Sequence, residues 1–138
     1  MGPIINGKQV KNIKHLMDNG IFQGAKLALK GEIQGNIISP YIFTETDPES
    51  VLAKEESFGP ILPVLKAQDE THALFLANYT ENGLSSAVCT QDYELGWKFA
   101  LGIEAGMTHI NDTSVDDQTI APFGGEKIQD RDALMTSR

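Results

Sequence analysis

The chain has 138 residues, of which 41% are apolar and 22% are charged, and its formal net charge is −8. These values are ordinary for a globular protein of one domain, and no apolar run approaches the ~20 residues that a membrane span requires. The acidic balance argues against a nucleic-acid partner, because Lys and Arg provide most of the affinity for phosphates.

The N-terminus and the cysteine content favour a cytoplasmic protein. Residues 1–6 contain neither the basic region nor the apolar region of a secretory signal. The single cysteine cannot form an internal disulfide, which fits a reducing compartment.

The first predicted element is a helix that begins after Asn6. This residue is suited to cap the helix, with Gln9 three residues later as in a capping box, and Asn19 and Gly20 supply a stop signal. Apolar residues recur between them at helical spacing and give the helix one face for a core. They are Val10, Ile13, Leu16 and Met17.

Two strands are expected after this helix. Residues 24–30 alternate as a strand does, and a turn at 34–36 leads into a second apolar segment, 37–43. Pro40 lies inside the second segment and has no N–H for a ladder, so we expect a sheet edge or a break there. The segment after it begins with turn residues at 46–49 and becomes acid-rich.

The longest regular pattern runs from Pro63 to Asp112. Three short apolar segments, 63–67, 86–90 and 107–110, alternate with two segments of helix length, which is typical of a βαβαβ unit. Parallel strands need crossovers of this length. The predicted fold class is therefore α/β, a mostly parallel sheet with helices on both faces.

The two helices within this unit carry start and stop signals. Asp69 and Asp92 are suited to cap them, and Asn82–Gly83 and Gly106 are suited to end them. Ligands of such sheets bind beyond the carboxyl ends of the strands. We therefore look for chemistry in the polar loop 111–117, although a hydrated loop without a chemical role explains the same residues.

The individual chemical candidates do not form a catalytic set. Cys89 is the only thiol, but it lies between apolar neighbours in a predicted buried strand, which favours packing over nucleophilic attack. The histidines have no neighbours at ligand spacing, so we expect no metal site, and we expect His109 to be half-buried and satisfied. Gly124 and Gly125 belong to no complete phosphate-binding fingerprint.

Four segments become informative when they are read together. They are EESFGP at 55–60, NGLSSAV at 82–88, GMTHIN at 106–111 and PFGGEK at 122–127. Their order and spacing resemble the aldehyde dehydrogenase superfamily, and the resemblance extends from Gly2 to Lys127. It covers only the later part of that family's catalytic domain, and it is most similar to the branch that oxidises aromatic aldehydes, the benzaldehyde and vanillin dehydrogenases.

This resemblance implies a place for a dinucleotide, NAD or NADP. In this family the glutamate that matches Glu56 holds the ribose hydroxyls next to the nicotinamide, and the phenylalanine that matches Phe58 packs near the nicotinamide ring. A carboxylate can accept from two vicinal hydroxyls, and an aromatic ring can flank a flat heterocycle. The residues by themselves leave a second interpretation open, in which 55–60 is a solvated loop with one buried Phe as its anchor.

The same resemblance implies a substrate pocket for an aldehyde. Residues between Asn111 and Phe123 line the aldehyde funnel in relatives. This suggests Asp112, Ser114 and Phe123 as pocket positions, while the residues alone are equally consistent with a hydrated loop.

Several parts of the family's chemistry have no match in the chain. The nucleophilic cysteine, the oxyanion-binding Asn, the water-activating Glu and the dinucleotide-binding domain would lie before Met1. Cys89 occupies a strand position that is usually apolar in the family. We expect residues 1–127 to be the C-terminal part of a catalytic domain and residues 128–138, which diverge from the family, to be a disordered tail.

These features predict a fragment of an NAD(P)-dependent aldehyde dehydrogenase, from a truncated or interrupted gene or from deliberate truncation. The fragment alone is expected to be inactive and to bind neither cofactor tightly. The alternatives are a non-enzymatic module that pairs with a separate chain carrying the missing half, and weak nucleotide binding through Glu56 and Phe58 only. A homo-oligomer is expected from the family's habit and from exposed apolar surface.

Overall fold

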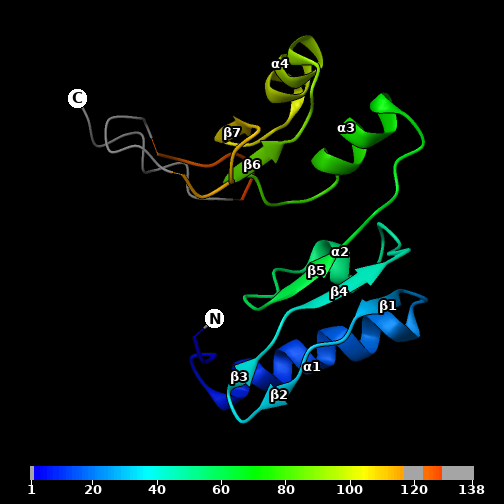
Figure 1. Ribbon diagram of the computed structural model, residues 1–138, viewed down its shortest axis with the longest axis vertical. Helices are drawn as coiled ribbons and strands as arrows, with labels where there is room; N and C mark the ends of the chain where they lie inside the picture. The colour runs from blue at the N-terminus through cyan, green and yellow to red at the C-terminus, as the bar shows by residue number, and fades with distance from the viewer. Residues whose placement is uncertain (1, 117–122, 129–138) are drawn as a thin grey trace. The chain divides into compact units, whose positions relative to one another are not determined.

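The computed structural model describes residues 2–116 and 123–128. It contains two compact units, residues 1–68 and 69–138, each with its own strands and helices (Figure 1). Both units combine helices with a parallel strand pair, so the predicted α/β class is confirmed. Among the described residues, none of the helices combines the length and the hydrophobicity that a membrane span requires.

The first unit consists of a long helix, a short helix and two small sheets. Strand β4 is central in the larger sheet, with β1 antiparallel on one side and β5 parallel on the other, while β2 and β3 form a separate antiparallel pair. The elements are α1 (Gly7–Phe22), β1 (Lys26–Leu29), β2 (Ile33–Gln34), β3 (Ile37–Ile38), β4 (Tyr41–Thr44), α2 (Val51–Lys54) and β5 (Ile61–Pro63).

Helix α1 begins where the sequence predicts and ends later. The Asn6 side chain accepts from the backbone N–H of Gln9 at 2.9 Å, which confirms the predicted cap. The predicted stop at Gly20 lies inside the helix, and the chain turns instead at Gly24, where φ is +98°. Gly20 is buried against Leu52 of α2, and a Cβ at this position would overlap the Leu52 side chain.

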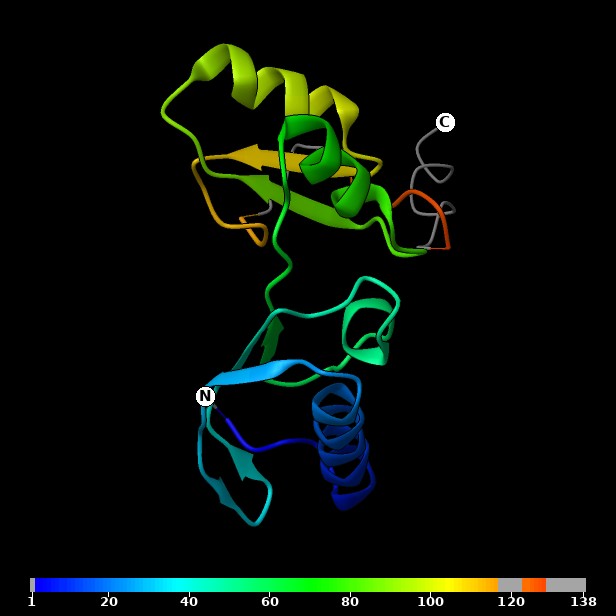
Figure 2. The same cartoon turned by 90° about the vertical axis from the view of Figure 1, so that its right-hand side faces the viewer.

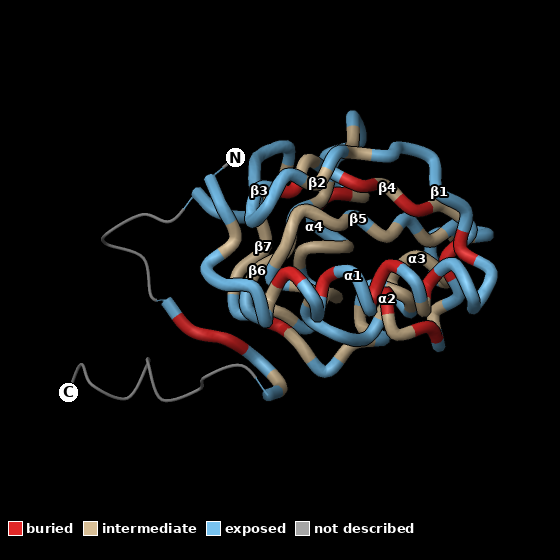
Figure 3. The backbone as a smooth tube through the Cα atoms, turned by 90° about the horizontal axis from the view of Figure 1, so that it is seen from below, coloured by how far each residue is buried: buried red, intermediate tan, exposed pale blue. Residues whose placement is uncertain are grey.

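One hydrophobic cluster forms the core of the first unit, and its buried segments of α1 and β4 are marked in Figure 3. The predicted apolar face of α1 supplies four of its members. The others lie on β3, β4 and α2, except Ala25, which immediately precedes β1. Burial of a large apolar side chain stabilises a fold by roughly 1.5–3 kcal/mol. The cluster comprises Val10, Ile13, Leu16, Met17, Ala25, Ile38, Tyr41, Phe43 and Leu52.

The second unit is a parallel strand pair with two helices. Helix α4 contacts both strands and lies along them in Figure 2. Gly96, the buried residue of α4, allows this approach, because a Cβ there would lie 3.1 Å from Cγ2 of Ile110 on β7. The elements are α3 (Glu70–Asn78), β6 (Ser85–Val88), α4 (Tyr93–Gly102) and β7 (Met107–Ile110).

The helix starts in the second unit are as predicted, and the helix ends are not. Asp69 and Asp92 accept from backbone N–H groups three residues later, as N-caps do. Helix α4 ends at Gly102 because Asn78, the last residue of α3, binds the chain there: its Nδ2 donates to the Gly102 carbonyl at 2.8 Å, and its Oδ1 accepts from the N–H of Glu104 at 2.9 Å.

The predicted βαβαβ unit differs from the observed pairing at its first strand. Strand β5 ends at Pro63 and pairs with β4, whereas the prediction placed a strand at 63–67 beside the later two. The later two strands, β6 and β7, are parallel neighbours as predicted. The break at Pro40 is confirmed, since it separates β3 from β4.

Candidate functional site

The carboxyl ends of β6 and β7 form the first part of the candidate site, where the strand order predicts it. Asn111 follows β7 with φ +58°, and its side chain binds the Thr90 backbone twice: Oδ1 accepts from the N–H, and Nδ2 donates to the carbonyl, each at 2.8 Å. Asn tolerates this left-handed backbone better than most residues. A surface pocket here is lined by Cys89, Thr90, Gln91, Tyr93 and Asn111.

Cys89 lines this pocket and is exposed, so the prediction of a buried thiol is wrong. Strand β6 ends at Val88, one residue before Cys89, and the chain then continues toward α4. The pocket lining around the thiol is polar and aromatic and carries no positive charge of the kind that stabilises a thiolate. The position of Cys89 after the end of β6 therefore leaves its thiol accessible.

His109 lies on β7 opposite Ala87 of β6 and is half-buried, as predicted. Its Nε2 atom is buried and has no hydrogen-bond partner among the described residues, so the prediction of a satisfied ring is wrong. Within 2–116 and 123–128 no three His, Cys, Asp or Glu side chains are grouped as a metal ion would need. The ring of His109 thus has no co-ligands in that part of the chain.

The polar loop after β7 carries two of the predicted pocket residues. Asp112 is exposed, and its Oδ1 accepts from the N–H of Thr113 at 2.7 Å. Ser114 is also exposed, and its carbonyl accepts from the Ser85 hydroxyl at 2.6 Å, which joins the loop to the first residue of β6. Asp117, the last residue of the predicted loop, lies outside the described residues.

Three of the four sequence motifs converge on one backbone carbonyl in the second unit. The oxygen of Gly83 accepts from the N–H of Gly106 at 2.9 Å and from the N–H of Glu126 at 2.8 Å. A Cβ on Gly106 would overlap the carbonyl of Gly124, so only glycine allows this approach. Phe123, the third predicted pocket residue, immediately precedes this contact and is 48% exposed.

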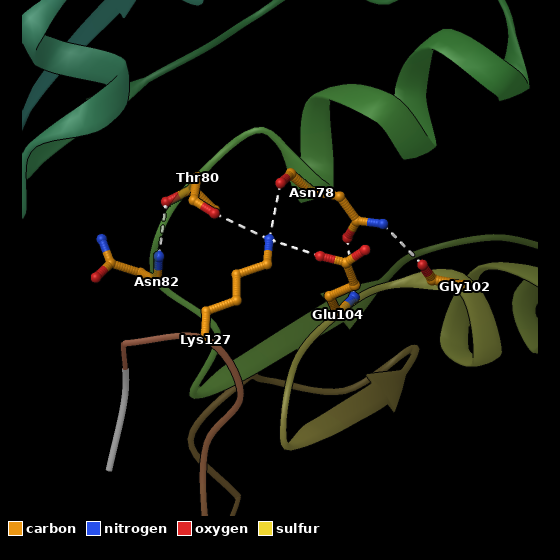
Figure 4. Close-up of polar contacts among 6 residues, drawn as sticks. All are labelled: Asn78, Thr80, Asn82, Gly102, Glu104 and Lys127. Carbon is orange, nitrogen blue, oxygen red and sulfur yellow. Dashed lines mark hydrogen bonds and ion pairs between the residues drawn. The ribbon is translucent and has the colours of Figure 1, made fainter. Parts of the chain in front are cut away.

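Lys127 is the polar centre of this junction (Figure 4). Its Nζ donates to the carbonyls of Asn78 at 2.7 Å and Thr80 at 2.9 Å and lies 3.1 Å from Oε2 of Glu104. Its side chain is 18% exposed, so these contacts are largely shielded from water. One ammonium group therefore joins the end of α3, the turn before β7 and the PFGGEK segment.

Only part of this junction is marked by a sequence motif. Lys127 ends one of the four motifs, but its role there was missed because lysine is usually a solvated surface residue. Asn78 was missed entirely, because its partners Gly102 and Glu104 lie far along the chain and no local pattern marks them.

The residues predicted to contact the dinucleotide lie in the first unit. Glu56 is exposed, and Phe58 is 75% exposed, so the alternative of a loop with a buried Phe anchor is wrong. Phe58 has a positive φ of +43°, which is an outlier for a bulky side chain. The structure thus presents this aromatic ring to solvent on a constrained backbone.

The predicted site residues are divided between the units. Glu56 and Phe58 belong to the first, and Asp112, Ser114 and Phe123 belong to the second. The first group offers a carboxylate acceptor and an aromatic face, and the second offers a carboxylate, a hydroxyl and an aromatic edge. These are recognition groups for a sugar, a flat ring and a small organic substrate.

Comparison with known proteins identifies relatives along nearly the whole chain. The model of the aldehyde dehydrogenase family matches residues 1–128. A vanillin dehydrogenase from Corynebacterium glutamicum is 41% identical over 127 residues, which cover 92% of this chain and 26% of the relative. The chain therefore spans about a quarter of the length of the curated relatives it matches.

Solved structures show the same relationship. An NAD-dependent benzaldehyde dehydrogenase from Corynebacterium glutamicum matches with a TM-score of 0.79 and 41% identity, over 81% of this chain and 25% of that one. A salicylaldehyde dehydrogenase from Pseudomonas putida G7, complexed with salicylaldehyde, matches with a TM-score of 0.89 and 31% identity, over 98% of this chain and 29% of that one.

Proposed function

Because this chain belongs to the aldehyde dehydrogenase family, we propose that residues 1–127 form the C-terminal part of the catalytic domain of an enzyme that oxidises an aromatic aldehyde to its carboxylic acid with NAD or NADP. The observation that carries this proposal is the family match over residues 1–128 together with 41% identity to a vanillin dehydrogenase. The likeness to benzaldehyde and salicylaldehyde dehydrogenases supports the aromatic substrate class.

In this proposal Glu56 and Phe58 contact the nicotinamide half of the cofactor. The carboxylate of Glu56 accepts from the ribose hydroxyls, and the ring of Phe58 flanks the nicotinamide. The exposure of both residues supports this assignment, since a ligand can reach them.

Asp112, Ser114 and Phe123 line the aldehyde pocket of the enzyme. A contact at one end of each segment supports this assignment, because it anchors the segment to the strands and helices of the second unit. The first segment starts at the Asn111–Thr90 pair, and the second ends at Lys127.

The groups that perform the reaction lie outside these 138 residues. The family attacks the aldehyde with a cysteine thiolate, transfers hydride to NAD(P) and hydrolyses the thioester with a Glu-activated water. Cys89 does not match the nucleophile motif of the family, and the other residues that line its pocket are Thr90, Gln91, Tyr93 and Asn111. The chain alone therefore does not turn over, and it binds neither NAD nor NADP tightly.

An activity assay tests this proposal. NADH or NADPH formation from benzaldehyde is measured for this chain and for a version extended upstream with the sequence that precedes it in its genomic DNA. We expect activity only in the extended protein. An extended protein that carries the family's cysteine motif and still shows no aldehyde-dependent reduction would contradict the proposal.

A second candidate function is a non-enzymatic module that pairs with a separate chain carrying the missing half. It is favoured by the burial pattern of the second unit, where the buried residues among those described are all glycines. Large apolar side chains lie exposed instead, and apolar surface of this kind marks interaction sites. They include Phe75 at 55%, Tyr93 at 73%, Trp97 at 59% and Leu101 at 82% exposure.

The genomic neighbourhood distinguishes the two candidates. A reading frame directly upstream that encodes the nucleophile favours a split or interrupted enzyme, and an unlinked context favours the separate module. In either case we place the protein in the cytoplasm as a homo-oligomer. Light scattering that shows a clean monomer at micromolar concentration would contradict the homo-oligomer.

A further inference from the structure

The backbone at Phe58 is held in a conformation that its side chain disfavours. Its φ of +43° lies in the left-handed region, which bulky residues rarely adopt, yet its ring is 75% exposed and gains little from burial. The contacts of the ring itself therefore do not explain the conformation. The constraint must come from the residues on either side.

The residue before Phe58 is held by helix α1. The side-chain amide of Gln9 donates from Nε2 to the carbonyl of Ser57 at 2.8 Å, across 48 positions of sequence. Gln9 is itself fixed on the first turn of the helix, where its N–H donates to the Asn6 side chain. The capping-box spacing predicted a local role for this glutamine, and the structure directs its amide to the loop instead.

The residue after Phe58 is held by the same helix. A Cβ on Gly59 would lie 2.5 Å from Cδ1 of Ile13, a core residue with 0% exposure, so the glycine backbone packs directly on α1. The Gly59 carbonyl also accepts from the N–H of Ile61 at 2.8 Å and from the Ser57 hydroxyl at 3.2 Å. Both flanks of Phe58 are thus attached to one rigid element.

We propose that Gln9 is a positioning residue: with the Gly59–Ile13 contact it holds Phe58 in its left-handed conformation, so that the ring stands outward as a fixed platform for the flat ring of the cofactor. That the flat ring is the nicotinamide rests on the proposed function. The constraint on the Phe58 backbone rests only on the Gln9–Ser57 hydrogen bond and the Gly59–Ile13 contact. A platform that is already in place when the cofactor arrives avoids the entropy of ordering it on binding.

Nuclear magnetic resonance of the 138-residue chain without nucleotide tests this proposal. Gln9→Met removes the donor with little change in size, and Gln9→Lys keeps an N–H donor on a longer side chain. Gln34→Met is the matched control, because the Gln34 amide makes a local, exposed bond to Glu32. The readouts are the backbone and ring signals of Phe58 and the hydrogen exchange of the Ile61 amide.

We expect Gln9→Met to shift or broaden the Phe58 signals and to accelerate Ile61 exchange about fivefold to tenfold, with β4 exchange unchanged. Gln9→Lys should restore most of the wild-type behaviour, and Gln34→Met should resemble the wild type. Unchanged Phe58 signals in Gln9→Met, or equal disturbance in Gln9→Met and Gln9→Lys, would overturn the proposal.

If the Gln9→Met variant fails to fold, Gly59→Ala tests the second contact that constrains Phe58, the packing of Gly59 on Ile13. The added Cβ should displace the loop from Ile13 and move the Phe58 signals, and wild-type signals in this variant would also overturn the proposal. Because no nucleotide is present, these outcomes are separate from those of the dehydrogenase assay. Failure of that assay would show that the cofactor is not the ligand of the Phe58 ring, but it would not affect the conclusion that Gln9 constrains the Phe58 backbone.

Discussion

Nζ of Lys127 donates to the carbonyl oxygen of Asn78, the last residue of α3, over 2.7 Å. The same ammonium binds the Thr80 carbonyl and lies beside Glu104. Removing it by Lys127→Met leaves these acceptors without their charged donor in a partly shielded site. We expect this change to lower the free energy of unfolding by about 2–3 kcal/mol, measured by urea denaturation.

Lys98→Met provides the matched control for this prediction. Lys98 forms an ion pair with Glu70 at 2.8 Å, but both side chains are more than half exposed, so its loss should cost about 0–1 kcal/mol. Equal losses for the two variants would show that the Lys127 contacts add nothing beyond those of a surface pair.

Asn111→Ala tests the pair of bonds between the Asn111 side chain and the Thr90 backbone. The variant loses two hydrogen bonds and places alanine at φ +58°, so we expect a loss of about 2–3 kcal/mol in unfolding free energy. Asn111→Gly loses the same bonds but tolerates the positive φ, and should retain about 1 kcal/mol more. If the alanine variant is as stable as the wild type, the pair is not a structural anchor.

Gly20→Ala tests the close approach of α1 and α2. The new Cβ would overlap the Leu52 side chain, and overpacking of this kind costs about 1–3 kcal/mol. Gly7→Ala on the same helix has open space around its Cβ and should be neutral or slightly stabilising, by about 0–1 kcal/mol. Denaturation midpoints of the two variants that move together would argue against the packing role of Gly20.

Cys89 should react with an aromatic disulfide reagent in the native chain. The thiol is exposed in its pocket and belongs to the only cysteine, so about one equivalent of the reagent's aromatic thiol per chain should be released without denaturant. A thiol that reacts only after denaturation would restore the original prediction of a buried residue.

Local signals predicted the helix starts, and tertiary contacts decided the helix ends. Asn6, Asp69 and Asp92 cap their helices as expected, because a cap depends on residues three positions apart. Gly20 and Gly106 were interpreted as stop signals, but each is glycine because another segment approaches too closely for a Cβ. Such an approach cannot be predicted without the fold.

The candidate site was predictable where a motif marks it. Glu56, Phe58, Asp112, Ser114 and Phe123 were named by resemblance, and their roles stay predictions. The exposure of Cys89 could not be anticipated, because it depends on β6 ending at Val88. The hydrogen bond from Gln9 to Ser57 could not be predicted either, because the two residues lie 48 positions apart and a capping-box spacing already explains the glutamine.

The decisive measurement is the production of NADH from benzaldehyde by the 138-residue chain itself, with the Cys89→Ser variant measured in parallel. We propose that this chain supplies residues that contact the cofactor and the substrate in a dehydrogenase and lacks the nucleophile, so neither protein should form NADH above the buffer rate. Steady NADH formation by the unmodified chain that disappears in Cys89→Ser would contradict it.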